Sequence, residues 1–384
     1  MNPYEAAAYL PAGAPADYTD PWLEIDSAAL AHNVRQIRAK TGNVPIMGVV
    51  KANAYGHGAV AIARELQKHG IEQFAVAKVA AAVALRHSGF SGPILNLGPF
   101  SAQEARLLIQ HNIDQSIYNE AVDVLANAAR ELGQVARVHI KIDTGLSRVG
   151  VPFGAALPFM VDVAARPELA IAGLFTTLVE DEAYDPVQIT RLNEVVAAVQ
   201  AQGLDPGIVH AASSAAVIQG TAPMLDMVRV GNGFYGFEPQ TLVDTKPILS
   251  LHARVITVKT LMPGDSIAYH RRGLIERETR VATLPVGYAD GYPFNAVDNG
   301  AQVLIRGRRW PLIVYMSANH VTVDVTGGPE IQVGDEAVLF GRQGDAEISI
   351  SELARWGSSS EYKICTNLSP LLPRVFRYSG VDIA

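Results

Sequence analysis

The sequence contains a single cysteine, no long hydrophobic run and no run of basic residues. Cys365 has no partner for an intrachain disulfide, and a single thiol argues against a metal site built from cysteines. No segment reaches the roughly 20 uninterrupted apolar residues of a membrane span. Residues 1–20 lack the basic and apolar regions of a signal peptide. The formal net charge of −7 excludes strong attraction to nucleic acids or anionic membranes. We therefore expect a cytoplasmic protein that binds neither.

The chain has 384 residues, of which 49% are hydrophobic and 18% charged, so it can bury a large core. Up to about residue 240, short apolar runs alternate with segments whose apolar residues recur at helical spacing. Some eight strand–helix repeats predict an α/β fold, a (β/α)8 barrel of the TIM type, with a doubly wound open sheet as the alternative. The runs are VPIMGVVK, QFAVAK, GPILNLG, IDQSIY, VARVHIKIDT, IAGLFTT, PGIVHAAS and LDMVRVGNG.

The pattern changes after about residue 245. Short β-type runs such as RVATLPVG and VTVDVTGG follow one another, separated by glycine, proline and aspartate turns. We therefore expect a barrel over residues 12–244 and a mainly β C-terminal domain over residues 245–384, against which residues 1–11 could also pack. The segment WLEIDSAALAHNVRQI, residues 22–37, predicts a helix.

Polar side chains stand at or near the ends of five predicted barrel strands. They are Lys51, Lys141, Thr177, His210 and Arg229. Because the C-terminal ends of the strands form the active-site face of such barrels, we expect these five to converge. One lysine at a strand end is usually held in an ion pair, whereas five polar residues together favour a site. A lysine that has lost part of its hydration presents a neutral amine more readily, as Schiff-base formation requires.

A place for a phosphate group follows the last two predicted strands. Gly231 and Asn232 can direct backbone N–H groups at an anion, and Ser214 can add a hydroxyl. The same Gly-Asn-Gly stretch is equally compatible with an ordinary tight turn. Pyridoxal phosphate needs an amine, a phosphate site and a partner for its ring nitrogen, so it is the cofactor that this set of residues suggests.

Seven segments resemble, in the same order, motifs of the alanine racemase family. The resemblance covers nearly the whole chain and implies a pyridoxal 5'-phosphate enzyme with a (β/α)8 barrel and a C-terminal β domain. It also implies a homodimeric isomerase that interconverts L- and D-alanine and thereby supplies a D-amino acid. The segments are VVKANAYGHG, HIKIDTGLSRVG, VHAASSAA, DMVRVGNGFYG, GDSIAYH, LPVGYADGYP and EYKICTNLSPLLPRV.

The resemblance implies roles for individual residues. Lys51 would be the Schiff-base lysine and one catalytic base, and Tyr269 the other, contributed by the second subunit. Arg148 would help to hold the cofactor and the substrate carboxylate, oriented by Lys141, which matches a lysine that is often carbamylated in the family. Arg229 would face the ring nitrogen, with His210 hydrogen-bonded behind it. The residues expected to bind the cofactor are Lys51, Tyr55, His210, Ser214, Arg229, Gly231, Asn232 and Tyr362.

Two bases suit a racemase, because one proton leaves one face of the α-carbon and another arrives on the opposite face. Tyr269 can serve only if nearby positive charge lowers its pKa well below ~10. Arg229 can only donate a hydrogen bond, which leaves the ring nitrogen largely unprotonated. A decarboxylase would place an acid there, and a non-catalytic cofactor carrier would not need the β domain. His57, His139 and His210 do not form the cluster of a metal-dependent hydrolase.

Four positions depart from the family pattern. Thr177 stands where a histidine usually supports the catalytic tyrosine. Ala318 and Asn319 replace a methionine and an aspartate, and Phe294, which follows Tyr288 in GYADGYPFN, replaces an arginine. An acid and a base are thus lost together, which leaves no unpaired charge. The smaller Ala318 would admit larger amino acids, each methylene of space being worth about 1–3 kcal/mol. A racemase of broader specificity, or one for serine or a basic amino acid, is therefore the alternative.

Overall fold

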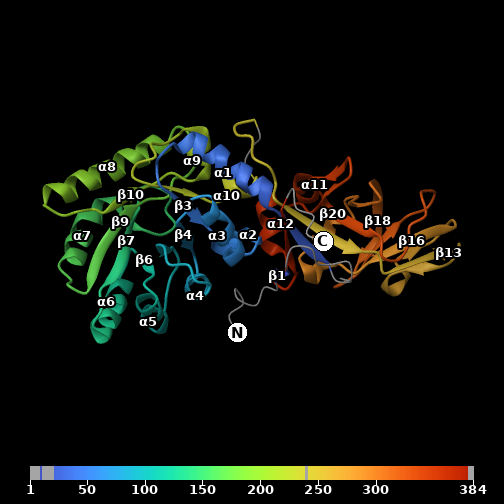
Figure 1. Cartoon of the computed structure of the whole chain (residues 1–384), viewed down its shortest axis with the longest axis horizontal. Helices are drawn as coiled ribbons and strands as arrows, with labels where there is room; N and C mark the ends of the chain where they lie inside the picture. Colours follow the sequence, from blue (N-terminus) through green and yellow to red (C-terminus); the bar gives the residue numbers. More distant parts are fainter. Residues whose placement is uncertain (1–8, 11–20, 238–240, 379–384) are drawn as a thin grey trace.

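The computed structural model describes residues 9–10, 21–237 and 241–378, which form two domains side by side (Figure 1). The first is a barrel of strands and helices, and the second is largely β-sheet. One hydrophobic core runs through both, including Val49 of the barrel and Leu251 and Val303 of the second domain. None of the helices in the described ranges is long and apolar enough to cross a membrane.

Parallel strands form the barrel, paired in the order β10, β9, β7, β6, β5, β4, β3 and β11. A parallel bridge between His210 and Met227 joins β10 to the residue before β11, so that the ring nearly closes. The predicted (β/α)8 barrel is confirmed, and the alternative of an open doubly wound sheet is wrong. The strands are β3 (Ile46–Val49), β4 (Gln73–Val76), β5 (Ile94–Asn96), β6 (Asp114–Ile117), β7 (Ala136–Asp143), β9 (Leu169–Phe175), β10 (Ile208–His210) and β11 (Val228–Val230), and β8 (Val151–Pro152) pairs with β7 outside the ring.

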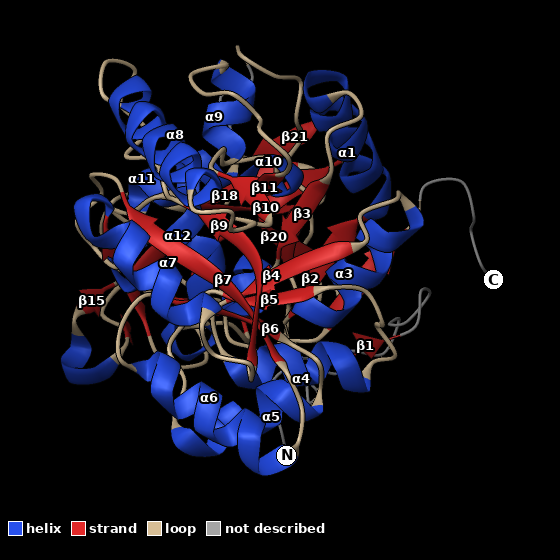
Figure 2. Cartoon of the chain, turned by 90° about the vertical axis from the view of Figure 1, so that its left-hand side faces the viewer, coloured by secondary structure: helices blue, strands red, loops and turns tan. Residues whose placement is uncertain are grey.

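Helices surround the barrel strands, as Figure 2 shows. Local sequence begins and ends several of them. Ser101 and Glu104 form a capping box at the start of α5, and Gly133 ends α6 in the left-handed conformation. The helices are α1 (Ser27–Thr41), α2 (Lys51–Tyr55), α3 (Ala59–Lys68), α4 (Val79–His87), α5 (Ala102–Gln110), α6 (Ala121–Leu132), α7 (Ala156–Ala164), α8 (Asp185–Ala201), α9 (Ser214–Gln219) and α10 (Asn232–Tyr235).

The second domain is built on a long sheet, paired in the order β1, β22, β2, β12, β20, β17, β18, β19, β16 and β13, as predicted for a mainly β domain. A short helix, α11 (Ile350–Trp356), packs on β20, and a second one, α12 (Glu361–Asn367), packs on α11 and on α2 of the barrel. The strands are β1 (Tyr9–Leu10), β2 (Trp22–Asp26), β12 (Leu249–Arg254), β13 (Thr257–Leu261), β16 (Thr279–Leu284), β17 (Gln302–Ile305), β18 (Arg308–Met316), β19 (Val321–Asp324), β20 (Glu336–Gln343), β21 (Ala346–Ile348), which pairs with β20, and β22 (Arg374–Arg377), with a separate hairpin of β14 (Ser266–Ile267) and β15 (Gly273–Leu274).

The expectation of one helix over residues 22–37 is wrong in its first part. Residues Trp22–Asp26 form strand β2, which pairs with β12 and β22 of the second sheet, and the helix begins only at Ser27. Asp26 sets that boundary, because its carboxylate accepts the backbone N–H groups of Ala28 and Ala29, both at 2.9 Å. The barrel segment predicted from residue 12 thus contributes one strand to the other domain. Of residues 1–11, the pair Tyr9–Leu10 joins β22 as β1, and residues 1–8 and 11 lie outside the described ranges.

Candidate active site

A cavity of about 770 Å³ opens where the barrel strands end. It brings together most of the residues predicted from the sequence, although they come from distant parts of the chain. Tyr362 reaches it from α12 of the second domain, whereas the others belong to the barrel. The predicted residues that line the cavity are Lys51, Tyr55, Lys141, Arg148, Thr177, Ser214, Arg229, Gly231, Asn232 and Tyr362.

The chain after Lys51 makes a left-handed helical turn. Ala52, Asn53, Ala54 and Tyr55 all have positive φ values, between 51° and 57°. This conformation costs roughly 1–2 kcal/mol per residue for L-amino acids, so the rest of the structure must hold it in place. Asn53 provides part of that support: its side-chain oxygen accepts the N–H of Ala59 at 2.8 Å, and its carbonyl accepts that of Gly58 at 2.8 Å.

The second domain holds the end of the same turn. The fully buried Arg374 of β22 donates two hydrogen bonds, of 3.0 and 2.8 Å, to the carbonyl oxygen of Gly56. A Cβ atom on Gly56 would lie 1.9 Å from the carbonyl oxygen of Cys365 in α12. Only glycine therefore allows α12, with Tyr362, to come this close to the Lys51 turn.

Two lysines at the cavity have lowered pKa values. Burial lowers the pKa of Lys51, with a further decrease caused by Arg148 and Arg229 and a partial opposing effect of Glu180. Burial, and then the same two arginines, lower the pKa of Lys141 to about 8. Both amines are therefore easier to deprotonate than an exposed lysine, as nucleophilic attack on a carbonyl or on carbon dioxide requires.

Arg229 is buried in the floor of the site, and burial lowers its pKa to about 10. Its Nη2 atom donates to the carbonyl oxygens of Thr176 at 2.8 Å and Ala211 at 2.9 Å. Its Nη1 atom donates to Nδ1 of His210 at 2.8 Å. His210 does not line the cavity. It lies behind Arg229, where its ring stacks on Phe175 with a centroid distance of 4.8 Å. The expected pairing of Arg229 with His210 is therefore present.

A small polar pocket follows β10 and β11. The N–H groups of Gly231 and Gly233 donate to Oγ of Ser214 at 3.0 and 3.2 Å, so that the hydroxyl hydrogen of Ser214 remains to be donated. Among the described residues, the buried Oδ1 of Asn232 has no hydrogen-bond partner. A Cβ atom on Gly231 would lie 2.7 Å from the hydroxyl of Tyr55, so the glycine keeps space beside that ring.

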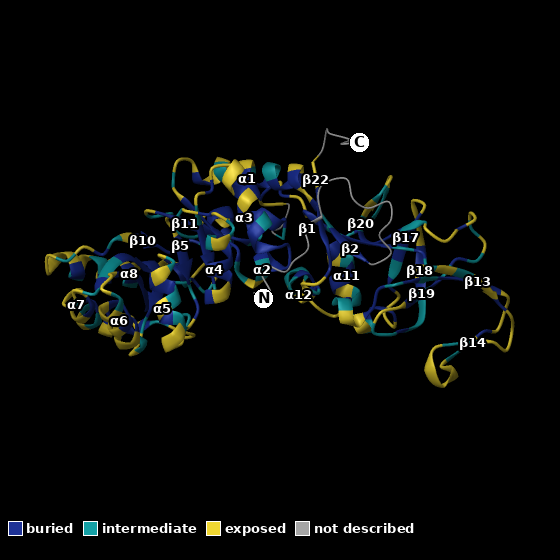
Figure 3. Cartoon of the chain, turned by 60° about the horizontal axis from the view of Figure 1, so that its bottom comes forward, coloured by how far each residue is buried: buried dark blue, intermediate teal, exposed yellow. Residues whose placement is uncertain are grey.

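The structure does not bring every predicted residue to the cavity. Tyr269 begins a short 3-10 helix after β14 and is 72% exposed. Strand β14 lies at the end of the second domain that is far from the barrel (Figure 3). Tyr288 and Phe294 are half-exposed on the same domain, and neither they nor Ala318 and Asn319 line the cavity. Within one chain, the predicted second base is therefore not beside Lys51.

Sequence reasoning missed several residues of the site. The ring of Phe175 stacks against the ring of His210, with a centroid distance of 4.8 Å. The cationic groups of Arg229 and Lys141 lie 5.2 and 5.8 Å from the centroid of the Phe175 ring. Glu180 lines the cavity and accepts the hydroxyl of Ser213 at 3.0 Å. His139, which sequence reasoning considered only as part of a metal cluster, lies two residues before Lys141 on β7 and contacts His210 instead of lining the cavity.

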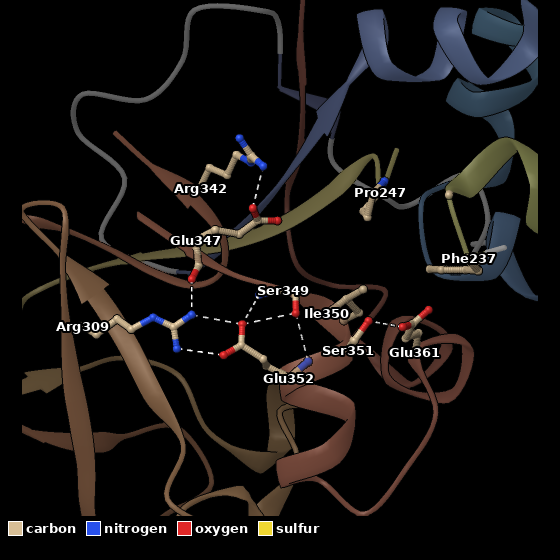
Figure 4. A pocket seen from close by; sticks show the side chains of 11 residues that line it. Phe237, Pro247, Arg309, Arg342, Glu347, Ser349, Ile350, Ser351, Glu352 and Glu361 are labelled. Carbon is tan, nitrogen blue, oxygen red and sulfur yellow. Dashed lines mark hydrogen bonds and ion pairs between the residues drawn. The ribbon is translucent and has the colours of Figure 1, made fainter. Parts of the chain in front are cut away.

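A second cavity lies in the C-terminal domain and the linker that enters it (Figure 4). Its volume is about 700 Å³, and charged residues line it. These charges already have partners: Arg309 contacts Glu352 at 2.8 Å, and Arg342 contacts Glu347 at 2.6 Å. Glu361 accepts the hydroxyl of Ser351. Both arginines of this cavity are therefore paired with carboxylates, whereas among the described residues Glu361 contacts a hydroxyl and not a cation.

The chain is similar to known proteins along most of its length. Residues 25–239 match the family described as "Alanine racemase, N-terminal domain", and residues 248–376 match "Alanine racemase, C-terminal domain". The alanine racemase of Halothermothrix orenii is 36% identical over 366 residues, covering 93% of this chain and 96% of its own. That of Geobacter sulfurreducens is 37% identical over 371 residues, covering 92% and 96%.

Comparison with solved structures points to the same family. The crystal structure of alanine racemase from Bacillus anthracis with bound L-Ala-P has a TM-score of 0.89 and 30% identity, and the match covers 97% of this chain and 98% of that one. A histidine racemase from Leuconostoc mesenteroides has a TM-score of 0.85 and 26% identity, covering 94% and 99%. With its barrel, its β domain and its cavity at the strand ends, this chain belongs to the alanine racemase family and is an isomerase of the amino-acid racemase type.

Proposed function

We propose that the protein interconverts L- and D-alanine, with pyridoxal phosphate as cofactor and with Lys51 and Tyr269 as the two bases. One observation carries this proposal. The amine of Lys51, with its lowered pKa, lines the same cavity as Arg148, Arg229 and the Gly231 turn. An amine, a carboxylate-binding arginine, a donor for a ring nitrogen and a phosphate pocket are the groups that this chemistry needs.

The residues of the cavity fit pyridoxal phosphate. Lys51 would hold its carbonyl carbon, and the hydroxyl hydrogen of Ser214, left free by the bonds from Gly231 and Gly233, would be donated to its phosphate. When bound, this cofactor withdraws electrons from the α-carbon of an amino acid and makes its proton acidic. Arg229 would donate to the ring nitrogen. An amino-acid decarboxylase needs an acid at that position, so the arginine speaks against this alternative.

The two bases would act on opposite faces of the α-carbon. Lys51 would exchange a proton on one face, and Tyr269 would exchange one on the other. Because Tyr269 is 72% exposed and does not line the cavity of its own chain, we infer that the site is completed by the Tyr269 of a second copy. A homodimer would then carry two shared sites. Arg148 and Arg229, which line the cavity, would place positive charge in such a shared site.

A racemase for larger amino acids is the second candidate. Phe294 stands edge-on to Tyr288 and Tyr315, with centroid distances of 5.8 and 5.6 Å, so an aromatic surface occupies the position of the family's arginine. Ala318 is small and Asn319 carries no charge. Arg272, three residues after Tyr269, lies over the ring of Tyr315 at 5.5 Å. If Tyr269 of the partner subunit completes the site, this aromatic surface would come close to it as well. The similar histidine racemase indicates that this fold can act on amino acids other than alanine.

The proposal is tested by proton NMR of the cofactor-loaded protein in heavy water. L-alanine, L-serine, L-histidine, L-lysine and L-arginine are supplied in turn, and the loss of the α-proton and the appearance of the D-enantiomer are followed. We expect alanine to exchange and invert fastest, and we expect Lys51→Ala to abolish both. Faster turnover of a larger amino acid would favour the second candidate. Absence of exchange with every amino acid, although the cofactor is bound, would refute racemisation.

A further inference from the structure

A chain of buried polar side chains runs from Arg229 through the interior of the barrel. Nη1 of Arg229 lies 2.8 Å from Nδ1 of His210, and Nε2 of His210 lies 3.1 Å from Nδ1 of His139. Nε2 of His139 then lies 3.4 Å from Oδ2 of Asp114. All four residues are at most 8% exposed. Each comes from a different strand, namely β11, β10, β7 and β6, so the chain crosses the barrel rather than following one element.

The direction of every bond in this chain follows from the arginine. A guanidinium group has no acceptor, so Nδ1 of His210 must carry the free lone pair. The hydrogen of the neutral His210 ring is then on Nε2 and is donated to His139. Nδ1 of His139 accepts it, which places the hydrogen of His139 on Nε2, facing the carboxylate of Asp114. One tautomer of each histidine satisfies all three contacts.

The charges agree with this assignment. His210 has a pKa well below its usual value, because it is fully buried and lies beside Arg229 and His139, so it stays neutral. Burial alone would raise the pKa of Asp114, but contacts with His139 and Arg137 lower it, so it stays ionised. Arg137 binds the same carboxylate at 3.0 Å from the half-exposed start of β7. The chain therefore has a cation at one end and an anion at the other.

The barrel also leaves room for the central histidine pair. Gly173 of β9 faces His139, and a Cβ atom there would lie 2.5 Å from Nδ1 of that ring. Any larger residue at this position would displace the imidazole from its contact with His210. Core histidines that only fill space have no need of an ordered hydrogen-bond partner at each nitrogen. Here both nitrogens of both rings have a partner within 3.4 Å.

We propose that Asp114 and His139 are positioning residues, which act through His210 to fix the orientation of the Arg229 guanidinium in the active site. Of its five N–H groups, three donate to His210, Thr176 and Ala211. This leaves Nε–H and one Nη1–H without a partner among the described residues, and they are the groups that can face the cavity. Asp114 strengthens the chain by drawing the hydrogen of His139 towards it, which makes Nδ1 of His139, and in turn Nδ1 of His210, a better acceptor.

The expected effect on cofactor binding rests on the proposed function, whereas the assignment of the histidine tautomers does not depend on it. The first experiment is therefore a nitrogen-15 NMR measurement on histidine-labelled, cofactor-loaded protein without amino acid. A ring nitrogen that carries hydrogen has a clearly different shift from one with a free lone pair. We expect His139 and His210 both to carry hydrogen on Nε2. Hydrogen on Nδ1 of either ring would overturn the proposal, whatever the protein does with alanine.

The second experiment compares Asp114→Ala with Asp114→Asn and with the control Asp123→Asn, which removes a charge from an exposed ion pair with Arg166. We expect Asp114→Ala to shift the nitrogen resonances of both histidines and to weaken pyridoxal phosphate binding about tenfold. Asp114→Asn keeps an acceptor but loses the charge, so its effects should be smaller and in the same direction. The control should change neither measurement.

Unchanged histidine shifts and unchanged cofactor affinity in Asp114→Asn and Asp114→Ala would refute a positioning role. Should Asp114→Ala fail to fold, the Asn variant and the wild-type tautomers still decide the question. A loss of stability alone, with wild-type shifts, would mean that Asp114 is purely structural. A protein that shows the expected tautomers and yet exchanges no amino acid would refute the proposed function but not the assigned chain of polar contacts.

Discussion

Replacing Gly56 by alanine should weaken both the fold and the active site, because this residue lies where the two domains meet. Its φ of +90° is unfavourable for alanine, which costs roughly 1–2 kcal/mol. The added Cβ would also lie 1.9 Å from the carbonyl oxygen of Cys365, and relieving such overpacking costs about 1–3 kcal/mol more. We expect a total loss of about 2–5 kcal/mol in the free energy of unfolding.

The same substitution should reach the site through α12. Cys365 cannot move away without shifting that helix, and Tyr362 of the helix lines the cavity. Urea unfolding followed by far-ultraviolet circular dichroism measures the first effect, and titration with pyridoxal phosphate measures the second. We expect the affinity for the cofactor to fall by at least tenfold, in line with the effect of displacing a supporting residue at a site.

Gly133→Ala is the matched control. Gly133 also has a positive φ, of 63°, but a Cβ atom there would meet nothing within 4 Å. It should lose only the roughly 1–2 kcal/mol of backbone strain and keep its cofactor affinity. If Gly56→Ala is no less stable than Gly133→Ala and binds the cofactor like the wild type, the close approach of α12 does not constrain the site.

Three further predictions concern the site itself. Tyr269→Phe should abolish inversion of the amino acid while changing the free energy of unfolding by less than about 0.5 kcal/mol, because the side chain is 72% exposed. A larger loss of the free energy of unfolding, measured in urea, would contradict this. Lys141, with a pKa of about 8, should form a carbamate whose carbon-13 signal from labelled bicarbonate grows between pH 7 and 9, as the neutral amine becomes more abundant, and is absent in Lys141→Gln. The reversion of Phe294 to arginine together with Asn319→Asp should raise the ratio of alanine to arginine turnover several-fold, by about 1 kcal/mol or more; an unchanged ratio would mean that these positions do not select the substrate.

Several features of the fold could be predicted from local sequence. Most of the barrel strands lie in apolar runs bounded by turn residues. Helix boundaries at Ser101 and Gly133 follow from side-chain capping and from the left-handed conformation. Because parallel barrel strands end on one face, the same pattern predicted that Lys51, Lys141 and Arg229 would meet. These predictions succeed because each depends on periodicity or on a few neighbouring residues.

Other features depend on partners that are far away in the chain. Strand β2 was expected to be helical, and it is extended because it pairs with β12 and β22. Ala52 and Ala54 favour right-handed helix locally, yet they are left-handed. Arg374, which lies 318 residues from Gly56, supports that turn with two hydrogen bonds.

The composition and motifs of the sequence thus determined the barrel, the β domain and the set of polar residues at the strand ends. Only the tertiary structure decided which of them share a cavity, that Tyr269 lies outside it, and that Asp114 and His139 connect to Arg229. The physical reason is that hydrogen-bond partners and close approaches between strands are set by the closed barrel. No short stretch of sequence contains both members of such a pair.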